Sequence, residues 1–222
     1  YEEEHDLPWD YEALARSCLR ADAMLLDYDT GGGEFLLSLG HPGAQTAATE
    51  GYPPNIALCQ ETLLPLGIDF RPCNDPSVIP FPSGSFDLIL NRHGSFDAAE
   101  AHRLLKPGGV FLTEQVGADN DRDLVKRVLP GLEQPFPHLY LSQQRQVFEA
   151  AGFRILQAEE AYRPIFFYDV GAFVWFARII EWEFPGFSVD ACFDRLCAMH
   201  ADLERDGFLR GTIHRFLLAA RK

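Results

Sequence analysis

The stretch Ala23-Met24-Leu25-Leu26-Asp27-Tyr28-Asp29-Thr30-Gly31-Gly32-Gly33 decides the fold of this chain. It begins as an apolar run, passes through an acid and ends in a glycine-rich turn. Residues 23–26 have the pattern of a strand buried on both faces. Glycine permits positive φ and leaves no side chain between the backbone and a ligand. A helix expected over 34–39 would direct its N-terminal N–H groups at whatever lies above the turn. The stretch therefore predicts a cradle for a cofactor.

Further strands and helices alternate along the rest of the chain. Apolar runs bounded by turn residues predict strands over 44–49, 68–71, 86–90, 110–113, 153–158 and 211–220. Helices are expected over 8–19, 53–66, 97–105 and 142–151, with a further helix capped by Asn120. This alternation predicts an α/β protein with a doubly wound, mostly parallel seven-stranded sheet. At 222 residues, we expect one domain over 1–222.

Polar residues follow several of the predicted strands, namely Asp29, Glu50, Asp75, Asn91 and Glu114. Ligands of parallel α/β sheets bind beyond the carboxyl ends of the strands, so we expect these residues to share one site. Glu50 lies about 20 residues past the start of the glycines, where nucleotide-binding units place an acid on the ribose hydroxyls. The alternative is that Glu50 is a surface loop acid.

The order of these motifs resembles the class I S-adenosylmethionine-dependent methyltransferases, in particular the type 11 methyltransferase domain. The resemblance covers roughly residues 20–117. It rests on the glycine turn, Glu50, Asp75 before Ile79-Pro80-Phe81, the strand Ser85-Phe86-Asp87-Leu88-Ile89, and the turn Arg103-Leu104-Leu105-Lys106-Pro107-Gly108-Gly109. It implies a Rossmann-like sheet whose last strand is antiparallel, methyl transfer as the activity, and S-adenosylmethionine as the cofactor.

The resemblance also implies the cofactor-binding residues. These are Asp27, Asp29, Gly31 and Gly33 in the turn near the methionine part, Glu50 on the ribose, Asp75 and Pro76 beside the adenine, and Asn91 and Arg92 near the sulfonium. One position departs from the pattern acid-x-Gly-x-Gly-x-Gly, because Asp29 replaces the first glycine. A carboxylate there would either hold the ammonium of the cofactor or oppose its carboxylate.

Composition limits the partners. The formal net charge of −14 argues against nucleic acid, which needs clustered Lys and Arg. The chain has no apolar run of about 20 residues, so no membrane span is expected. The five cysteines show no CxxC pair, which indicates reduced thiols in a cytoplasmic protein and no metal site.

Residues 164–207 form an apolar, aromatic-rich insert between the last two predicted strands. Trp175, Phe176, Trp182, Phe184 and Phe187 gather there. One interpretation is a helical lid that closes over the methyl acceptor. The alternatives are ordinary packing on the sheet or the interface of a homodimer.

His93, just past the fourth strand, is the candidate catalytic general base, and a structural histidine is the alternative. We therefore expect a methyltransferase that acts on a small-molecule acceptor. A second hypothesis is a non-catalytic or cofactor-poor binding protein, which Asp29 supports. An NAD-dependent oxidoreductase would share the glycine turn, but the Ile79-Pro80-Phe81 and Lys106-Pro107-Gly108-Gly109 segments disfavour it.

Overall fold

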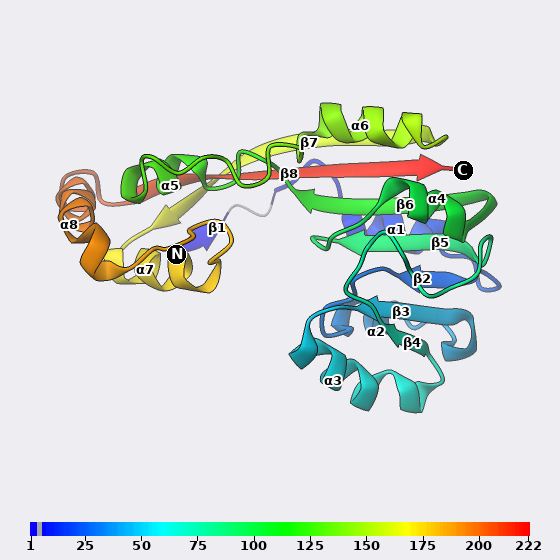
Figure 1. The fold of residues 1–222 in the computed structure, drawn as a ribbon. Coiled ribbons are helices and arrows are strands. Elements are labelled where there is room, and N and C mark those ends of the chain that lie inside the picture. The colour runs from blue at the N-terminus through cyan, green and yellow to red at the C-terminus, as the bar shows by residue number, and fades with distance from the viewer. Residues whose placement is uncertain (4–5) are drawn as a thin grey trace. The chain divides into compact units, whose positions relative to one another are not determined.

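The computed structural model describes residues 1–3 and 6–222 (Figure 1). Within these residues the sheet contains β1 (Glu2–Glu3), β2 (Leu25–Asp27), β3 (Thr46–Glu50), β4 (Asp69–Pro72), β5 (Phe86–Arg92), β6 (Leu105–Val116), β7 (Arg154–Phe167) and β8 (Leu209–Arg221). The helices are α1 (Tyr11–Cys18), α2 (Glu34–Ser38), α3 (Pro53–Thr62), α4 (Ala98–Leu104), α5 (Arg122–Val128), α6 (Leu141–Ala150), α7 (Val170–Ile179) and α8 (Val189–Asp206), with short 3-10 turns η1 (Gly43–Gln45) and η2 (Leu64–Leu66).

The strand order is β1-β7-β8-β6-β5-β2-β3-β4. The strands β4, β3, β2, β5 and β6 are parallel, and β2 lies between β3 and β5. β8 runs antiparallel to β6, because Gly108 and Gly109 exchange backbone hydrogen bonds with Lys222 while Gly117 donates to His214 (Figure 1). The mostly parallel α/β sheet with a reversed last strand is thus confirmed.

The sheet has one strand more than the seven expected from the sequence. β1 pairs antiparallel with β7, with Glu2 opposite Phe166 and Glu3 opposite Ile165. A two-residue strand made of two glutamates has no apolar alternation, so its sequence gives no strand signal. The pairing partner, not the local sequence, makes this segment a strand.

The chain groups into two compact units. The core unit comprises 9–115, 141–159 and 216–222, and the accessory unit comprises 1–8, 116–140 and 160–215. The predicted insert, 164–207, falls within the accessory unit and contains α7 and α8. Its role as a lid and the single-domain organisation stay predictions.

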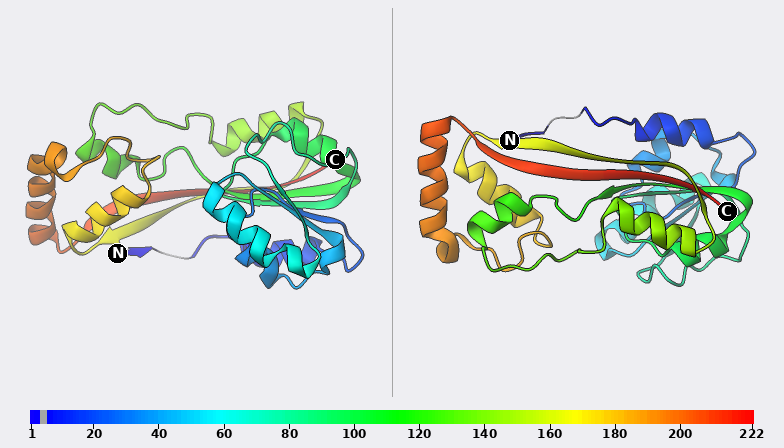
Figure 2. Two further views of the ribbon diagram at one scale, coloured as in Figure 1. Left: turned by 60° about the horizontal axis from the view of Figure 1, so that its bottom comes forward. Right: turned by 90° about the horizontal axis from the view of Figure 1, so that it is seen from above.

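In the core unit, helices cover both faces of the sheet (Figure 2). On one face, the Tyr11 hydroxyl of α1 donates to the carbonyl of Asn91 in β5 at 3.2 Å. On the other face, Phe148 of α6 is fully buried and its ring lies 5.3 Å from that of Phe111 in β6. This double covering explains why the central strands are apolar on both sides.

The accessory unit has a hydrophobic core of its own. α7 and α8 pack on each other and on α5, and Phe173, Phe184 and Met199 are among the buried side chains of this core. Asp169 and Ser188 cap the N-termini of α7 and α8 by accepting hydrogen bonds from backbone N–H groups three residues ahead.

A buried polar cluster lies beside this core, and it corrects the expected cap of α5. The residue at the N-cap is Asp121, with φ of 54° and no side-chain cap bond. The Asn120 carbonyl oxygen instead accepts from the His214 N–H at 3.1 Å and from Arg215 at 2.6 Å. Asn120 was expected to cap because it precedes a helical segment, but β8 offers its side chain partners that no local pattern reveals.

Candidate functional site

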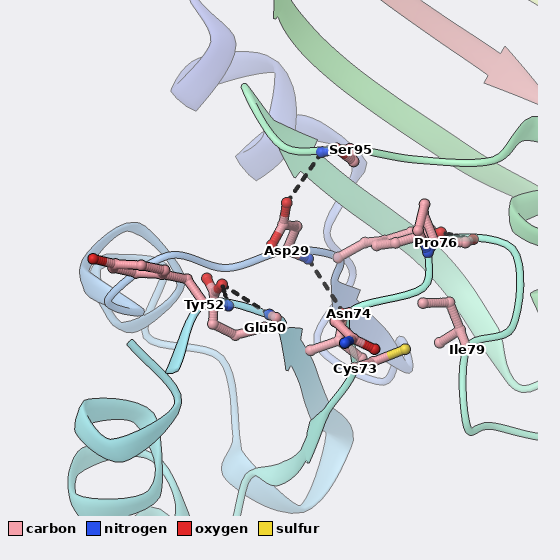
Figure 3. Close-up of a pocket in the computed structure, with 11 residues that line it drawn as sticks. Asp29, Glu50, Tyr52, Cys73, Asn74, Pro76, Ile79 and Ser95 are labelled. Atoms are coloured by element: carbon pink, nitrogen blue, oxygen red, sulfur yellow. Dashed lines mark hydrogen bonds between the residues drawn. The ribbon is translucent and has the colours of Figure 1, made fainter. Parts of the chain in front are cut away.

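A cavity of about 290 Å³ opens at the carboxyl ends of the parallel strands in the core unit (Figure 3). Its lining comes from the segments that follow β2, β3, β4 and β5. The lining residues are Tyr28, Asp29, Thr49, Glu50, Gly51, Tyr52, Cys73, Asn74, Pro76, Ile79 and Ser95. This is the sheet edge at which the sequence predicted a shared site.

Glu50 ends β3 with its side chain in this cavity, and the residue is only 4% exposed. Its Oε1 accepts from the backbone N–H groups of Gly51 and Tyr52, both at 2.8 Å. Its Oε2 accepts a long hydrogen bond, 3.5 Å, from the Asn55 side-chain amide, and the Glu50 carboxylate also lies within hydrogen-bond reach of the Asp29 side chain. The carboxylate is therefore oriented by one oxygen and can accept hydrogen bonds from a ligand diol with the other.

Asp29 also lines the cavity, and it has the backbone of a glycine. Its φ is 65°, a conformation that non-glycine residues other than Asn and Asp seldom adopt. Its Oδ2 accepts from the Ser95 N–H at 3.0 Å, as the dashed line in Figure 3 marks. Burial and the neighbouring Glu50 carboxylate raise the pKa of Asp29 to about 6.

The rest of the glycine turn shapes the backbone without lining the cavity. Gly31 and Gly33 have φ of 63° and 85°, and a Cβ added at Gly31 would meet no atom within 4 Å. Asp27 ends β2 and accepts from the Thr30 hydroxyl at 2.6 Å. Burial raises the pKa of Asp27 to about 6, although the Thr30 hydrogen bond and Arg92 oppose this shift. Asp27 is thus a structural anchor of the turn.

The loop after β4 presents Asn74 and Pro76 to the cavity, whereas Asp75 lies outside the lining. The Asp75 carboxylate accepts from the backbone N–H and hydroxyl of Ser77, at 2.9 and 2.7 Å, and these bonds lower its pKa. The Tyr28 hydroxyl donates to the carbonyl of Pro76 and joins this loop to the end of β2. The contact with an adenine amino group that the resemblance assigned to Asp75 therefore stays a prediction.

Asn91 and Arg92 also lie outside the cavity lining. Asn91 is fully buried, donates to the carbonyl of Tyr28 at 2.7 Å and accepts from Gln115 at 2.5 Å. It links the end of β5 to the glycine turn and to β6. The Arg92 guanidinium lies over the Phe35 ring, 4.9 Å from its centroid.

His93 follows them in a left-handed conformation, with φ of 61°. Its Nε2 lies 3.3 Å from Oε1 of Glu114, and its side chain is 42% exposed. The other oxygen of Glu114 accepts from the Trp9 indole N–H at 2.6 Å. Burial raises the pKa of Glu114, but the bonds from His93 and Trp9 outweigh it and leave that pKa below its usual range. The imidazole is therefore oriented by an ionised carboxylate.

Of the predicted site residues, the structure brings together Asp29, Glu50 and Pro76 in one cavity. Asp27, Gly31, Gly33, Asp75, Asn91, Arg92 and His93 lie in the surrounding loops and strand ends but outside its lining. The sequence reasoning missed the other lining residues, which are Tyr28, Thr49, Gly51, Tyr52, Cys73, Asn74, Ile79 and Ser95. Half of these adjoin a predicted residue in the sequence, so proximity to a motif was an available signal, whereas nothing in the sequence marked Ser95.

Other kinds of site find no support in residues 1–3 and 6–222. No group of three or more His, Cys, Asp or Glu side chains in this part of the chain is placed to hold a metal ion. None of the helices described there combines the length and apolarity that crossing a bilayer requires.

Comparison with known proteins agrees with this geometry. Residues 26–113 match the family described as a methyltransferase domain. A candidate methyltransferase from Bacillus halodurans C-125 superposes with a TM-score of 0.67 at 18% identity, covering 96% of this chain and 98% of that one. The YcgJ protein of Bacillus subtilis gives 0.62 at 18% identity, covering 96% and 97%. The [4+2]-cyclase SpnF gives 0.57 at 21% identity, covering 95% and 80%.

The strand order, the reversed last strand and the site at the carboxyl edge define the class I methyltransferase fold. Residues 26–113 are similar to the methyltransferase-domain family, and the solved structures show the same fold. A sequence comparison with functionally curated proteins finds no match. The similarity to SpnF, a cyclase, means that the fold alone does not fix the reaction.

Proposed function

We propose that this protein is an S-adenosylmethionine-dependent methyltransferase that acts on a small-molecule acceptor. The observation that carries the proposal is the cavity at the carboxyl edge, with the Glu50 carboxylate oriented inside it by two backbone N–H groups. The match of residues 26–113 to a methyltransferase domain supports the cofactor. The acidic charge of the chain and the size of the cavity favour a small acceptor over a polynucleotide.

The residues present fit a nucleoside cofactor. Glu50 has one carboxylate oxygen available for the ribose hydroxyls, and Asn74, Pro76 and Ile79 provide a mixed polar and apolar wall for the adenine. Open space beside Gly31 allows a ligand to approach the backbone of the turn. The other residues that the resemblance assigned to the cofactor lie outside the cavity lining. We infer that they shape and hold the surrounding loops, and they are Asp27, Gly33, Asp75, Asn91 and Arg92.

The protein would contribute orientation and removal of a proton. When bound, S-adenosylmethionine supplies a methyl group on a positively charged sulfur, which a lone pair of the acceptor displaces while the carbon–sulfur bonding pair stays on sulfur. We assign His93 as the general base. If its Nε2–H donates to Glu114, Nδ1 has the lone pair that takes the proton of the acceptor. The Trp9 indole orients the Glu114 carboxylate by a hydrogen bond, and this carboxylate in turn orients the His93 imidazole.

The insert 164–207 is proposed as the cover of the acceptor site, because it carries exposed aromatic side chains such as Trp175 on α7 and Trp182 in the turn after it. A homodimer through the same apolar side chains is the competing role. The five free thiols favour a cytoplasmic location. A binding protein without catalysis is the second candidate function, and the Asp29 carboxylate inside the cavity is the observation that favours it.

Calorimetric titration of S-adenosylmethionine into the wild type and into Glu50→Ala tests the cofactor site. Glu50→Ala removes hydrogen bonds between ligand and carboxylate, so we expect the affinity to fall about 100-fold, the equivalent of about 3 kcal/mol. Glu61→Gln, an exposed change on α3, is the matched control and should bind as the wild type does. Equal affinity of Glu50→Ala and the wild type would exclude the ribose assignment.

A further inference from the structure

Asp29 is built into the fold as an aspartate. It takes a positive φ that favours glycine, so its side chain is retained against a local backbone cost. The loop after β5 has adapted to it, because a Cβ added at Gly94 would lie 2.6 Å from both Cβ and Oδ2 of Asp29. The Ser95 N–H donates to the Asp29 carboxylate at 3.0 Å, and the Asp29 backbone N–H donates to the Thr49 hydroxyl oxygen at 3.2 Å. The carboxylate therefore has a fixed position.

That position places a second carboxylate in the cavity beside Glu50. Both side chains line the cavity, and each acts on the other electrostatically (Figure 3). The charged and titratable groups around the pair are Asp27 on β2, Glu34 on α2, the Cys59 thiol on α3 and Arg92 on β5, together with Tyr52 and Cys73 of the cavity lining. Arg92 acts on Asp27, but the carboxylates in this group outnumber it, so the cavity carries net negative potential.

This potential acts differently on the two forms of the cofactor. S-adenosylmethionine carries a positive sulfur, and S-adenosylhomocysteine, the product of methyl transfer, has a neutral thioether in an otherwise identical nucleoside. We propose that Asp29 is a specificity-determining residue that makes the site prefer the sulfonium over the neutral thioether. This inference rests on the proposed function. The role of Asp29 would be to promote the exchange of S-adenosylhomocysteine for S-adenosylmethionine after each methyl transfer.

The test is the ratio of two dissociation constants, for S-adenosylhomocysteine and for S-adenosylmethionine, measured by calorimetry at pH 8. Asp29→Asn keeps an oxygen for the Ser95 N–H and tolerates positive φ, but it removes the charge. We expect this ratio to fall about tenfold in Asp29→Asn and to stay at the wild-type value in Glu61→Gln. Sinefungin, which carries an amine in place of the methylated sulfur, should lose affinity in parallel with S-adenosylmethionine.

A pH series adds a second readout. Lowering the pH from 8 to 5 protonates Asp29, whose pKa burial raises to about 6, so the wild-type ratio should fall toward that of Asp29→Asn. The ratio of Asp29→Asn itself should change little. The α-ammonium and carboxylate are common to both ligands, and their titration cancels in the ratio. A ratio that is the same in Asp29→Asn and the wild type would overturn the inference while leaving the cofactor site intact.

The remaining outcomes are also decisive. If only Asp29→Gly binds the nucleosides, Asp29 blocks the site and the inference is wrong, although the cofactor site stands. If neither the wild type nor any variant binds at millimolar ligand, both the proposed function and this inference fall.

Discussion

Raising the pH from 5 to 8 should destabilise this protein, and the carboxylate of Asp121 should make the largest contribution. The residue is 2% exposed, and its Oδ1 has no hydrogen-bond partner among the described residues. Its Oδ2 accepts from Asn120 at 2.7 Å. Burial and the charge of Glu183, itself buried, raise the pKa of Asp121 to about 8, although Arg215 opposes the shift. Asp121 therefore keeps a proton that the unfolded chain releases.

The sign and size follow from proton linkage. A carboxyl group with a raised pKa in the folded state binds more protons folded than unfolded, so the free energy of unfolding falls as pH rises. The fall begins near the unfolded value of 3.8 and ends near 8. Each pH unit in this window costs about 1.4 kcal/mol, so the step from pH 5 to pH 8 costs about 4 kcal/mol. Glu183, whose pKa burial raises to about 7, adds a loss of the same sign.

Asp121→Asn removes the titrating group and keeps a side chain that tolerates the φ of 54°. We expect the variant to gain about 4 kcal/mol relative to the wild type when the pH goes from 5 to 8. Urea unfolding followed by far-UV circular dichroism measures this, and fluorescence of Trp175 and Trp182 reports on the accessory unit. Asp194→Asn, an exposed change on α8, is the control. If the variant and the wild type lose the same stability over this range, the reasoning from burial is refuted.

Two further substitutions test the packing of the core unit. Gly94→Ala should displace the Asp29 carboxylate and lower the melting temperature. Adding Asp29→Gly should restore the melting temperature, because it removes the atoms that the new Cβ meets. A double-mutant cycle with no coupling between the two sites would contradict the contact. Phe148→Ala should lower the free energy of unfolding by about 3–5 kcal/mol, because the buried ring packs on Phe96, Phe111 and Phe153. A loss under about 1 kcal/mol in urea titrations would mean that this residue does not anchor α6.

The parallel strands of the core unit were predictable from local pattern. Leu25 to Asp27 and Leu88 to Asn91 are buried on both faces, so these runs are mostly apolar and distinct from the helices between them. Glu50 and Asp29 follow two of these strands in the sequence. Because the carboxyl ends of parallel strands share one edge of the sheet, both residues were predicted to lie there. The length of β7 was underestimated, because its second part has two adjacent glutamates and Pro164 in place of an apolar run, and from Glu160 on it lies in the other unit.

The sequence by itself determined the doubly wound sheet, the glycine turn and the place of Glu50 at the carboxyl edge, because burial on two faces and positive φ leave direct marks on residue choice. Only the tertiary structure decided that Ser95 holds Asp29, that Ser77 draws Asp75 out of the cavity, and that Glu114 and Trp9 orient His93. These partners are a single N–H, a hydroxyl and an indole on separate segments. Such contacts depend on where loops meet in space. A hydrogen bond between distant segments leaves no periodic pattern in the sequence, so its donor and acceptor cannot be paired from the sequence alone.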